Sequence, residues 1–150
     1  MKTNFDLINI CKNNGIPLDC VVMKDQLLSL KRKKNMNIIV NLQSSTKGNG
    51  THWVALIIRN KNAFYFDSYG AIPPVEIIKF CGKNLTLGYN SYIVQDLNSV
   101  QCGLFCIALM HYLLLHNNDI YVAANDFINM FENDTKLNDD ILFDYFHRLY

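Results

Sequence analysis

Residues 95–116 read QDLNSVQCGLFCIALMHYLLLH, and this stretch decides the fold. Between Leu104 and Leu115, His111 is the one strongly polar residue. A helix that is apolar on nearly every face belongs in the middle of a core, where other elements pack all round it. About a dozen residues are too few to span a bilayer, which needs ~20. The stretch therefore predicts a central, buried helix.

Cys102 and Gly103 stand at the start of this helix. Unpaired backbone N–H groups and the positive end of the helix dipole favour thiolate over thiol there, and the thiolate is the nucleophilic form. Gly103 leaves room for a substrate backbone to approach. The alternative interpretation is a buried, unreactive cysteine, which is common in protein cores. The helix alone does not decide between the two.

The composition is that of one globular domain over residues 1–150, with 50% hydrophobic and 18% charged residues. It excludes disorder as the default state. The five cysteines form no CxxC pair and no short Cys/His spacing, which predicts neither a disulfide framework nor a metal site. A reducing intracellular setting is expected, and no N-terminal run has the features of a signal peptide.

The charges divide unevenly along the chain. Residues 1–61 carry ten Lys/Arg and three Asp/Glu, a balance of +7, whereas residues 62–150 carry four and ten, a balance of −6. The densest basic run is Lys31-Arg32-Lys33-Lys34. One interpretation is a solvated loop, and the other is a contact with nucleic acid.

Helical spacing, β-branched runs and turn formers predict the remaining elements. They are a helix at 4–13 capped by Thr3 or Asn4, a strand at 36–42, a hairpin of 52–58 and 63–67, a short helix from Pro73-Pro74 to Phe80, a strand at 91–95 (SYIVQ), and helices at 119–131 and 138–149. The pattern indicates an α+β fold: a small, mostly antiparallel sheet packed on the central apolar helix that bears Cys102.

The predicted hairpin brings two functional side chains together. His52 begins one strand and Asp67 ends its neighbour, so antiparallel pairing places both at one edge of the sheet. A cysteine nucleophile needs a base, a group that orients the base, and donors for an oxyanion. His52 and Asp67 fit the first two roles. Gln95, seven residues before Cys102, and the backbone N–H of Cys102 fit the third.

Each of these residues also has an ordinary interpretation. His52 could be a surface histidine at a strand end, and Gln95 a solvated amide. Asp67 could be a turn residue that binds its own backbone, and Asp96 could compete with it as the acid. His111 and His116 lie ~13 Å or more down the helix from Cys102, which makes them core or capping residues.

The order and spacing of these residues resemble the adenovirus maturation protease (adenain) family. The family order is His, acid, Gln, Cys. The resemblance is carried by His-Trp at 52–53, FDSYG at 66–70, Gln95, a gap of six residues and CGLFC at 102–106. CVVMKDQL at 20–27 and GTHWVAL at 50–56 are also similar to the short adenain-like proteases of virophages and Maverick/Polinton elements. The resemblance extends from about residue 15 to residue 116.

The resemblance implies a papain-like site with the chain order His-Asp-Gln-Cys, in the clan that includes SUMO-deconjugating proteases. It implies a cysteine endopeptidase that cleaves viral capsid or core precursors after small, Gly-type residues during virion maturation. Trp53 and Gly103, beside the base and the nucleophile, are the expected substrate contacts. The alternatives are a deconjugase acting on the Gly-Gly tail of a ubiquitin-like protein and an inactive scaffold that binds capsid protein. The intact Cys, His, Asp and Gln argue against the scaffold.

The expected partner is a protein substrate. The residues require no cofactor or metal, and the resemblance implies DNA and an activating peptide as candidate cofactors. A monomer without membrane contact is expected. Its setting would be the virion and the host cell interior, in a cytoplasmic virus factory or the nucleus.

Overall fold

The computed structural model describes residues 1–46, 51–116 and 119–148. Its centre is a five-stranded sheet with the strand order β1-β2-β3-β4-β5. The strands are rich in Val, Ile and aromatic residues, which pack well on a pleated surface. Their bounds are β1 Cys20–Met23, β2 Asn35–Asn41, β3 Trp53–Arg59, β4 Asn62–Phe66 and β5 Thr86–Tyr89.

The three central strands are antiparallel, and each edge strand is parallel to its neighbour. β2 pairs with β3 and β3 pairs with β4 in antiparallel register, whereas β1–β2 and β4–β5 are parallel. A parallel pair needs a crossover connection. A 3-10 helix connects β1 to β2, and a short α-helix connects β4 to β5. The predicted α+β class is confirmed, with parallel edges added to the antiparallel centre.

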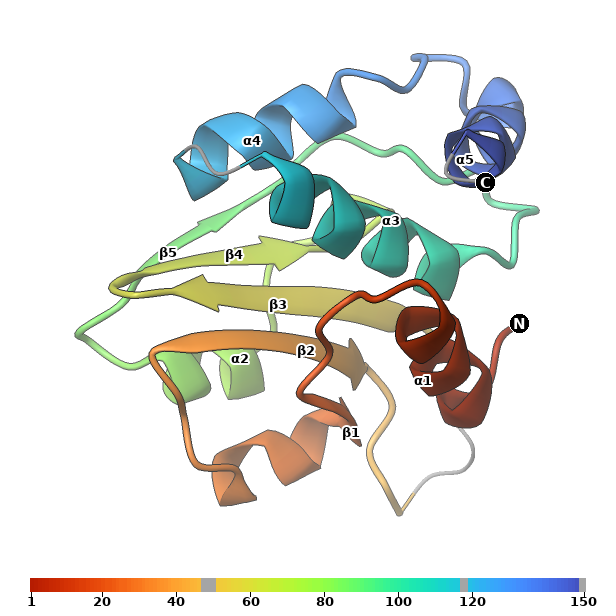
Figure 1. The fold of residues 1–150 in the computed structure, drawn as a ribbon. Coiled ribbons are helices and arrows are strands. Elements are labelled where there is room, and N and C mark those ends of the chain that lie inside the picture. Colours follow the sequence, from red (N-terminus) through yellow and green to blue (C-terminus); the bar gives the residue numbers. More distant parts are fainter. Residues whose placement is uncertain (47–50, 117–118, 149–150) are drawn as a thin grey trace.

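Helices cover both faces of the sheet (Figure 1). The bounds are α1 Asn4–Asn13, η1 Lys24–Ser29, α2 Val75–Cys81, α3 Cys102–Leu115, α4 Ile120–Ile128, η2 Thr135–Leu137 and α5 Asn138–His147. In Figure 1, α3 and α4 lie on one side of the sheet and α2 lies on the other. Apolar side chains fill both interfaces, so the sheet separates two hydrophobic cores.

The central helix is confirmed as α3. It begins at Cys102, and ten of its fourteen residues are buried, which agrees with an element surrounded by others. The first helix, α1, is also confirmed. Thr3 is its N-cap and forms a capping box with Asp6, which satisfies two backbone donors at the helix start.

The strand predicted at 91–95 is wrong. The chain forms β5 earlier, at Thr86–Tyr89, although this segment contains Gly88 and glycine weakens a strand interior. A Cβ at Gly88 would lie 2.8 Å from the ring of Tyr121, so packing against α4 requires the glycine. The backbone N–H groups of Val94 and Gln95 instead both donate to the carbonyl of Ser68, at 2.9 and 3.0 Å.

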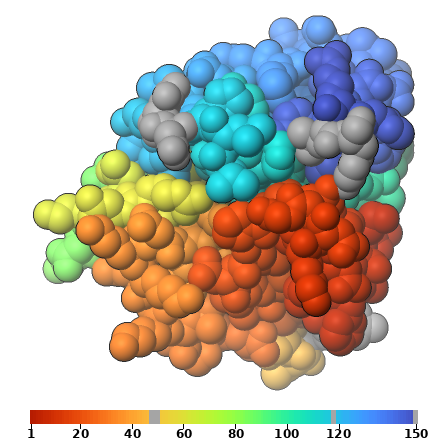
Figure 2. All heavy atoms as spheres, in the orientation of Figure 1, coloured from red at the N-terminus to blue at the C-terminus, as the bar shows by residue number. Residues whose placement is uncertain are grey.

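The two halves of the chain meet directly on the face drawn in Figure 2, where the red and orange N-terminal residues form the lower band. The cyan to blue residues lie above them. In the part of the chain that the structure describes, no helix combines the length and the apolar character that crossing a bilayer requires. Residues 47–50 of the predicted polar loop and residue 149 of the last predicted helix lie outside the described residues.

Candidate active site

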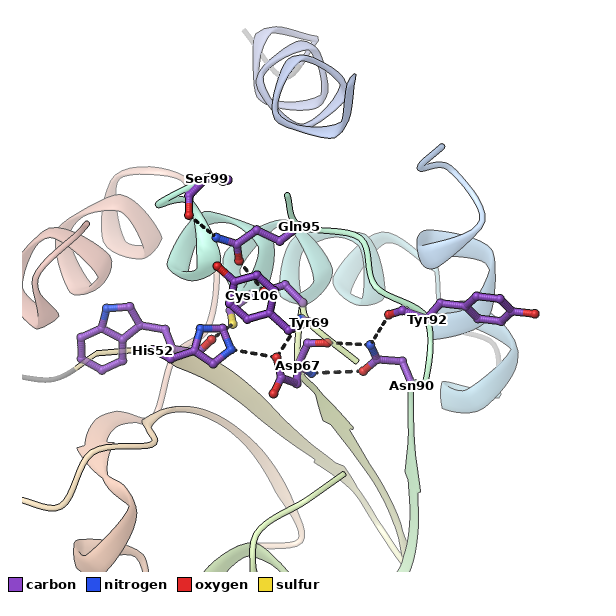
Figure 3. Close-up of polar contacts among 10 residues, drawn as sticks. His52, Asp67, Tyr69, Asn90, Tyr92, Gln95, Ser99 and Cys106 are labelled. Carbon is purple, nitrogen blue, oxygen red and sulfur yellow. Dashed lines mark hydrogen bonds and ion pairs between the residues drawn. The ribbon is translucent and has the colours of Figure 1, made fainter. Parts of the chain in front are cut away.

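His52 and Asp67 meet where the hairpin predicted them. His52 directly precedes β3 and Asp67 directly follows β4, and Nε2 of His52 lies 2.7 Å from Oδ1 of Asp67 (Figure 3). Asp67 is 1% exposed, so its carboxylate is shielded from water. The bond to Nε2 leaves Nδ1 as the imidazole nitrogen for a second partner.

That second partner is the thiol of Cys102. Burial alone would raise the pKa of the Cys102 thiol, but the hydrogen bond with His52, backbone groups of Trp53 and Gly103, and the imidazolium charge outweigh burial and hold the pKa below its ordinary value. Burial alone would likewise lower the pKa of His52. The hydrogen bonds with Asp67 and Cys102, and their charges, instead raise it to about 9. Both directions favour a thiolate–imidazolium pair.

The other four cysteines differ from Cys102 in their environment. All five cysteines are free. Burial raises the pKa of Cys11 and of Cys81 to about 11, and it raises the pKa of Cys20 and Cys106 as well. Cys106, one turn after Cys102, contacts the carbonyl of Trp53 through Sγ at 3.6 Å. A lowered thiol pKa therefore belongs to Cys102 alone among the five.

Asp67 also accepts a hydrogen bond from the backbone of its own turn, which is the alternative role that the sequence left open. The backbone N–H of Tyr69 donates to Oδ1 of Asp67 at 2.8 Å, the same oxygen that contacts His52. The next residue, Gly70, has φ +71, and a Cβ there would lie 2.8 Å from the carbonyl oxygen of Ser91. The turn therefore orients the carboxylate and requires glycine after it.

Two residues that the sequence did not single out support this pair. The ring of Tyr69 lies over the imidazole of His52, with centroids 4.8 Å apart and planes tilted by 30°. The side chain of Asn90 accepts from the backbone N–H of Asp67 at 3.1 Å and donates to its carbonyl at 2.7 Å. Figure 3 shows this chain of contacts running from His52 through Asp67 to Asn90. FDSYG marked the turn, but nothing in the sequence pointed to Asn90.

Gln95 is buried, at 1% exposure, and its amide is held at both ends. Oε1 accepts from the hydroxyl of Ser68 at 2.5 Å, and Nε2 donates to the carbonyl of Ser99 at 2.9 Å. A primary amide carries two N–H donors, so one N–H remains beside the bond to Ser99. The buried, doubly held amide excludes the solvated interpretation. Its role toward an oxyanion stays a prediction.

Trp53 and Gly103, the expected substrate contacts, pack against the N-terminal helix. Trp53 is 3% exposed, and its Nε1–H donates to the carbonyl of Lys2 at 2.9 Å. A Cβ at Gly103 would lie 2.6 Å from Cδ2 of Leu7, so the glycine lets α3 approach α1. Trp53 also lines a hollow of about 310 Å³ together with Val21, Met23 and Gln26. Contact of Trp53 and Gly103 with a substrate stays a prediction.

Asp96, His111 and His116 lie in other environments. Asp96 accepts from the hydroxyl of Thr135 at 2.9 Å rather than from His52, and its pKa is lowered mainly by a backbone hydrogen bond from Asn98. His111 contacts the hydroxyl of Tyr145 at 2.7 Å, and His116 is the C-cap of α3. The two histidines are therefore the core and capping residues that helix geometry predicted.

Two residues of the basic run at 31–34 already have partners within the protein. The guanidinium of Arg32 donates to the carbonyls of Phe80 and Cys81 at the end of α2, and Lys33 forms an ion pair with Asp19 at 3.0 Å. A hollow of about 520 Å³, the basic hollow, lies at the end of the sheet away from His52 and is lined by Arg32, Lys33, Lys34 and Lys61. Among the described residues, no group of three or more His, Cys, Asp or Glu is arranged to hold a metal ion.

Comparison with known proteins supports the fold and goes no further. No protein-family model matches the sequence, and no curated protein matches it. Similar solved structures include the ASFV pS273R protease, with a TM-score of 0.62 and 16% identity over 98% of this chain and 65% of that one. ChlaDub1 from Chlamydia trachomatis has a TM-score of 0.54 and 16% identity, and the match covers 97% of this chain and 76% of the ChlaDub1 chain. AvrA, in a structure with IP6 and CoA, has a TM-score of 0.52 and 18% identity, and the match covers 93% of this chain and 53% of the AvrA chain.

All three neighbours have the adenain-like cysteine protease fold, so the predicted papain-like architecture is confirmed. At 16–18% identity the likeness shows the fold alone. The chain spans 65% of the length of the ASFV protease chain. The closer resemblance to the virophage and Maverick/Polinton type rests on the sequence.

Proposed function

We propose that this chain is a cysteine endopeptidase with Cys102 as nucleophile, His52 as base and Asp67 as the group that orients the base. One observation carries the proposal. The thiol of Cys102, at the N-terminus of α3, contacts the imidazole of His52, whose Nε2 lies 2.7 Å from the buried carboxylate of Asp67. The pKa of the Cys102 thiol is lowered and the pKa of His52 is raised. A structural cysteine would not have its pKa lowered against burial.

The proposed reaction begins from the thiolate–imidazolium pair. The Cys102 thiolate attacks the scissile carbonyl, and the oxyanion that forms is bound by the backbone N–H of Cys102 and the second N–H of Gln95. The His52 imidazolium gives its proton to the leaving amine as the C–N bond breaks. Neutral His52 then takes a proton from water, which hydrolyses the thioester, releases the acid and restores the pair. Asp67 keeps Nδ1 directed at the sulfur throughout.

Capsid or core precursors are the proposed substrates, cleaved after Gly-type residues inside the virion or infected cell by a monomeric enzyme. The resemblance to the adenain family supports this substrate class. Burial supports the small-residue preference: Cys102 is 3% exposed and the side chain of His52 14%. A scissile carbonyl has to reach the sulfur through a narrow opening, which a branched or aromatic side chain beside it would obstruct.

The runner-up is a deconjugase acting on the Gly-Gly tail of a ubiquitin-like protein. It uses the same catalytic residues and the same narrow opening, and the clan relationship to SUMO-deconjugating proteases supports it. The two functions differ in the folded body that precedes the tail. A capsid precursor presents a flexible segment between domains, whereas a ubiquitin-like protein presents its C-terminus.

One experiment tests the proposal and its runner-up together. The protein is incubated with a capsid precursor and, separately, with a ubiquitin-like protein extended beyond its Gly-Gly tail, and new termini are identified by mass spectrometry. We expect termini after Gly-type residues in the capsid precursor, their loss in Cys102→Ala, and their retention in the control Cys20→Ala. Cleavage confined to the ubiquitin-like protein would favour the runner-up, and cleavage of neither would contradict both.

A nucleic-acid contact is proposed for the basic hollow as a secondary property. Lys34 and Lys61, from segments far apart in the sequence, line it together, and no described acidic side chain pairs with either within 4 Å. Phosphate groups are the ligands that such a surface attracts, without sequence preference. The hollow lies at the opposite end of the sheet from His52, so cleavage should not require DNA.

A further inference from the structure

The side chains of Thr135, Asn138 and Asp139 are hydrogen-bonded to the segment from Val94 to Cys102, which contains Gln95. The contacts are Nδ2 of Asn138 to the carbonyl of Val94 at 2.8 Å, the hydroxyl of Thr135 to Oδ2 of Asp96 at 2.9 Å, and the hydroxyl of Ser99 to Oδ1 of Asp139 at 2.7 Å. The donors and acceptors come from η2 and the first turn of α5. These elements belong to the part of the chain that the adenain resemblance does not reach.

Ser99 transmits these contacts to the candidate catalytic groups. Its carbonyl accepts from Nε2 of Gln95 at 2.9 Å, and its hydroxyl oxygen accepts from the backbone N–H of Gln101 at 3.2 Å while donating to Asp139. Gln101 is the N-cap of α3, directly before Cys102. The position of Ser99 therefore sets the direction of the Gln95 amide and the position of the Gln101 backbone directly before Cys102.

The C-terminal segment is itself firmly anchored. Asn138 is fully buried, and it accepts from the backbone N–H of Glu132 at 2.8 Å and donates to the Glu132 carbonyl at 2.9 Å. Leu142 of α5 is fully buried in the core that contains α3, and Tyr145 contacts His111 of α3. Because α5 is held to the helix that begins at Cys102, it can serve as a fixed support for the loop between them.

We infer that Asp139 is a positioning residue, which acts through Ser99 to hold the Gln95 amide and the Gln101–Cys102 backbone in place for an oxyanion. The inference rests on the proposed function. Oxyanion donors are effective only when preorganised, and a displacement of ~1 Å can cost ~10²-fold in rate. Loss of the Ser99 contact leaves Gln95 with its other partner, Ser68, so the amide should be displaced rather than released.

The test compares Asp139→Ala, Asp139→Asn and the matched control Asp140→Ala. Asp140 lies one residue further along α5 and is exposed, so its removal takes the same charge from the same turn. Peptide hydrolysis is measured per Cys102 titrated by iodoacetamide, which corrects for molecules that fail to fold. Alkylation forms no oxyanion, so its rate reports the Cys102–His52 pair without Gln95. Amide hydrogen exchange of residues 96–101 reports the loop directly.

We expect Asp139→Ala to lower kcat ~10–10²-fold with little change in KM or alkylation rate, and to accelerate exchange in 96–101. Asp139→Asn keeps an acceptor for Ser99 and should recover most of kcat, and Asp140→Ala should match the wild type. An unchanged kcat per titrated site in Asp139→Ala would overturn the inference. If the wild type cleaved no peptide, the proposed function would fail, and amide hydrogen exchange of residues 96–101 would test the positioning role by itself. Faster exchange in Asp139→Ala but not in Asp140→Ala would support that role, and unchanged exchange would overturn it.

Discussion

Replacement of Asp67 by Asn tests the charge arrangement of the site most directly. The substitution keeps the size of the side chain and an oxygen for Nε2 of His52, 2.7 Å away, but it removes the negative charge that faces the imidazolium. Asp67 raises the pKa of His52, so the variant should have a lower His52 pKa. The imidazolium then loses its proton at lower pH, and the thiolate of Cys102 loses part of its stabilisation.

The structure gives the magnitude. The pKa of His52 is raised from 6.5 to about 9, which corresponds to roughly 3 kcal/mol in favour of the imidazolium. Asp67 and Cys102 share this effect, so the loss of Asp67 should remove about half of it. We expect the alkaline limb of kcat/KM to move down by about one pH unit, so that activity falls about twofold at pH 8 and about tenfold well above pH 9. His52→Ala removes the base altogether and should be more damaging.

The assay is the pH dependence of kcat/KM for peptide hydrolysis, with the iodoacetamide reaction of Cys102 measured in parallel. The wild type should be active between the lowered pKa of Cys102 and the raised pKa of His52, because both charged partners exist there. In Asp67→Asn this window should narrow from both sides. Asp96→Asn, which removes the rival carboxylate, should leave both limbs in place. An alkaline limb that stays near pH 9 in Asp67→Asn would refute the assignment of Asp67.

Three further predictions concern the nucleophile, the packing and the basic hollow. At pH 7 iodoacetamide should label Cys102 ahead of the other four cysteines, whose pKa values burial raises, and even labelling of all five would contradict the nucleophile. Gly103→Ala should destabilise the fold by about 1–3 kcal/mol in chemical denaturation, because its Cβ would lie 2.6 Å from Leu7. Combination with Leu7→Ala should cost less than the sum, and strict additivity would argue against that clash. Duplex DNA binding through Lys34 and Lys61 should show a log–log salt slope of about −1.8, and Lys34→Ser with Lys61→Ser should remove most of it while Lys12→Ser with Lys136→Ser does not.

The oxyanion donor can be examined separately from the base. Gln95→Ala should lower kcat ~10²–10³-fold, the usual range for removal of one such donor, while the rate of Cys102 alkylation stays close to that of the wild type. A loss of alkylation as large as the loss of hydrolysis would show that Gln95 supports the nucleophile itself. Active-site titration of the same preparations supplies the number of competent sites.

Several features of this protein could be predicted from the sequence because they depend on neighbours along the chain. An apolar run with His111 as its one strongly polar residue requires a buried helix, and Thr3 with Asp6 makes a capping box at a fixed spacing of three residues. The short hairpin between β3 and β4 fixes their register, so the meeting of His52 with Asp67 follows from local geometry.

The remaining features depend on contacts between segments that are distant in the sequence. Gly88 made Thr86–Tyr89 a poor strand by propensity, yet the parallel ladder with β4 and the ring of Tyr121 make a strand there favourable. Gly103 suggested an open approach for a substrate, but the tertiary structure places Leu7 of α1 against it. Neither neighbour could be identified from local pattern.

The sequence by itself determined the three antiparallel strands, most of the helices and the residue types of the nucleophile, the base and the acid, since periodicity, turns and short spacings encode them. Only the tertiary structure decided what holds these groups in place: Tyr69 and Asn90 around Asp67, and Ser99 with Asp139 behind Gln95. The contact between Ser99 and Asp139 joins residues forty positions apart. Packing of α5 against α3 creates that proximity, and no periodicity or spacing within either segment records it.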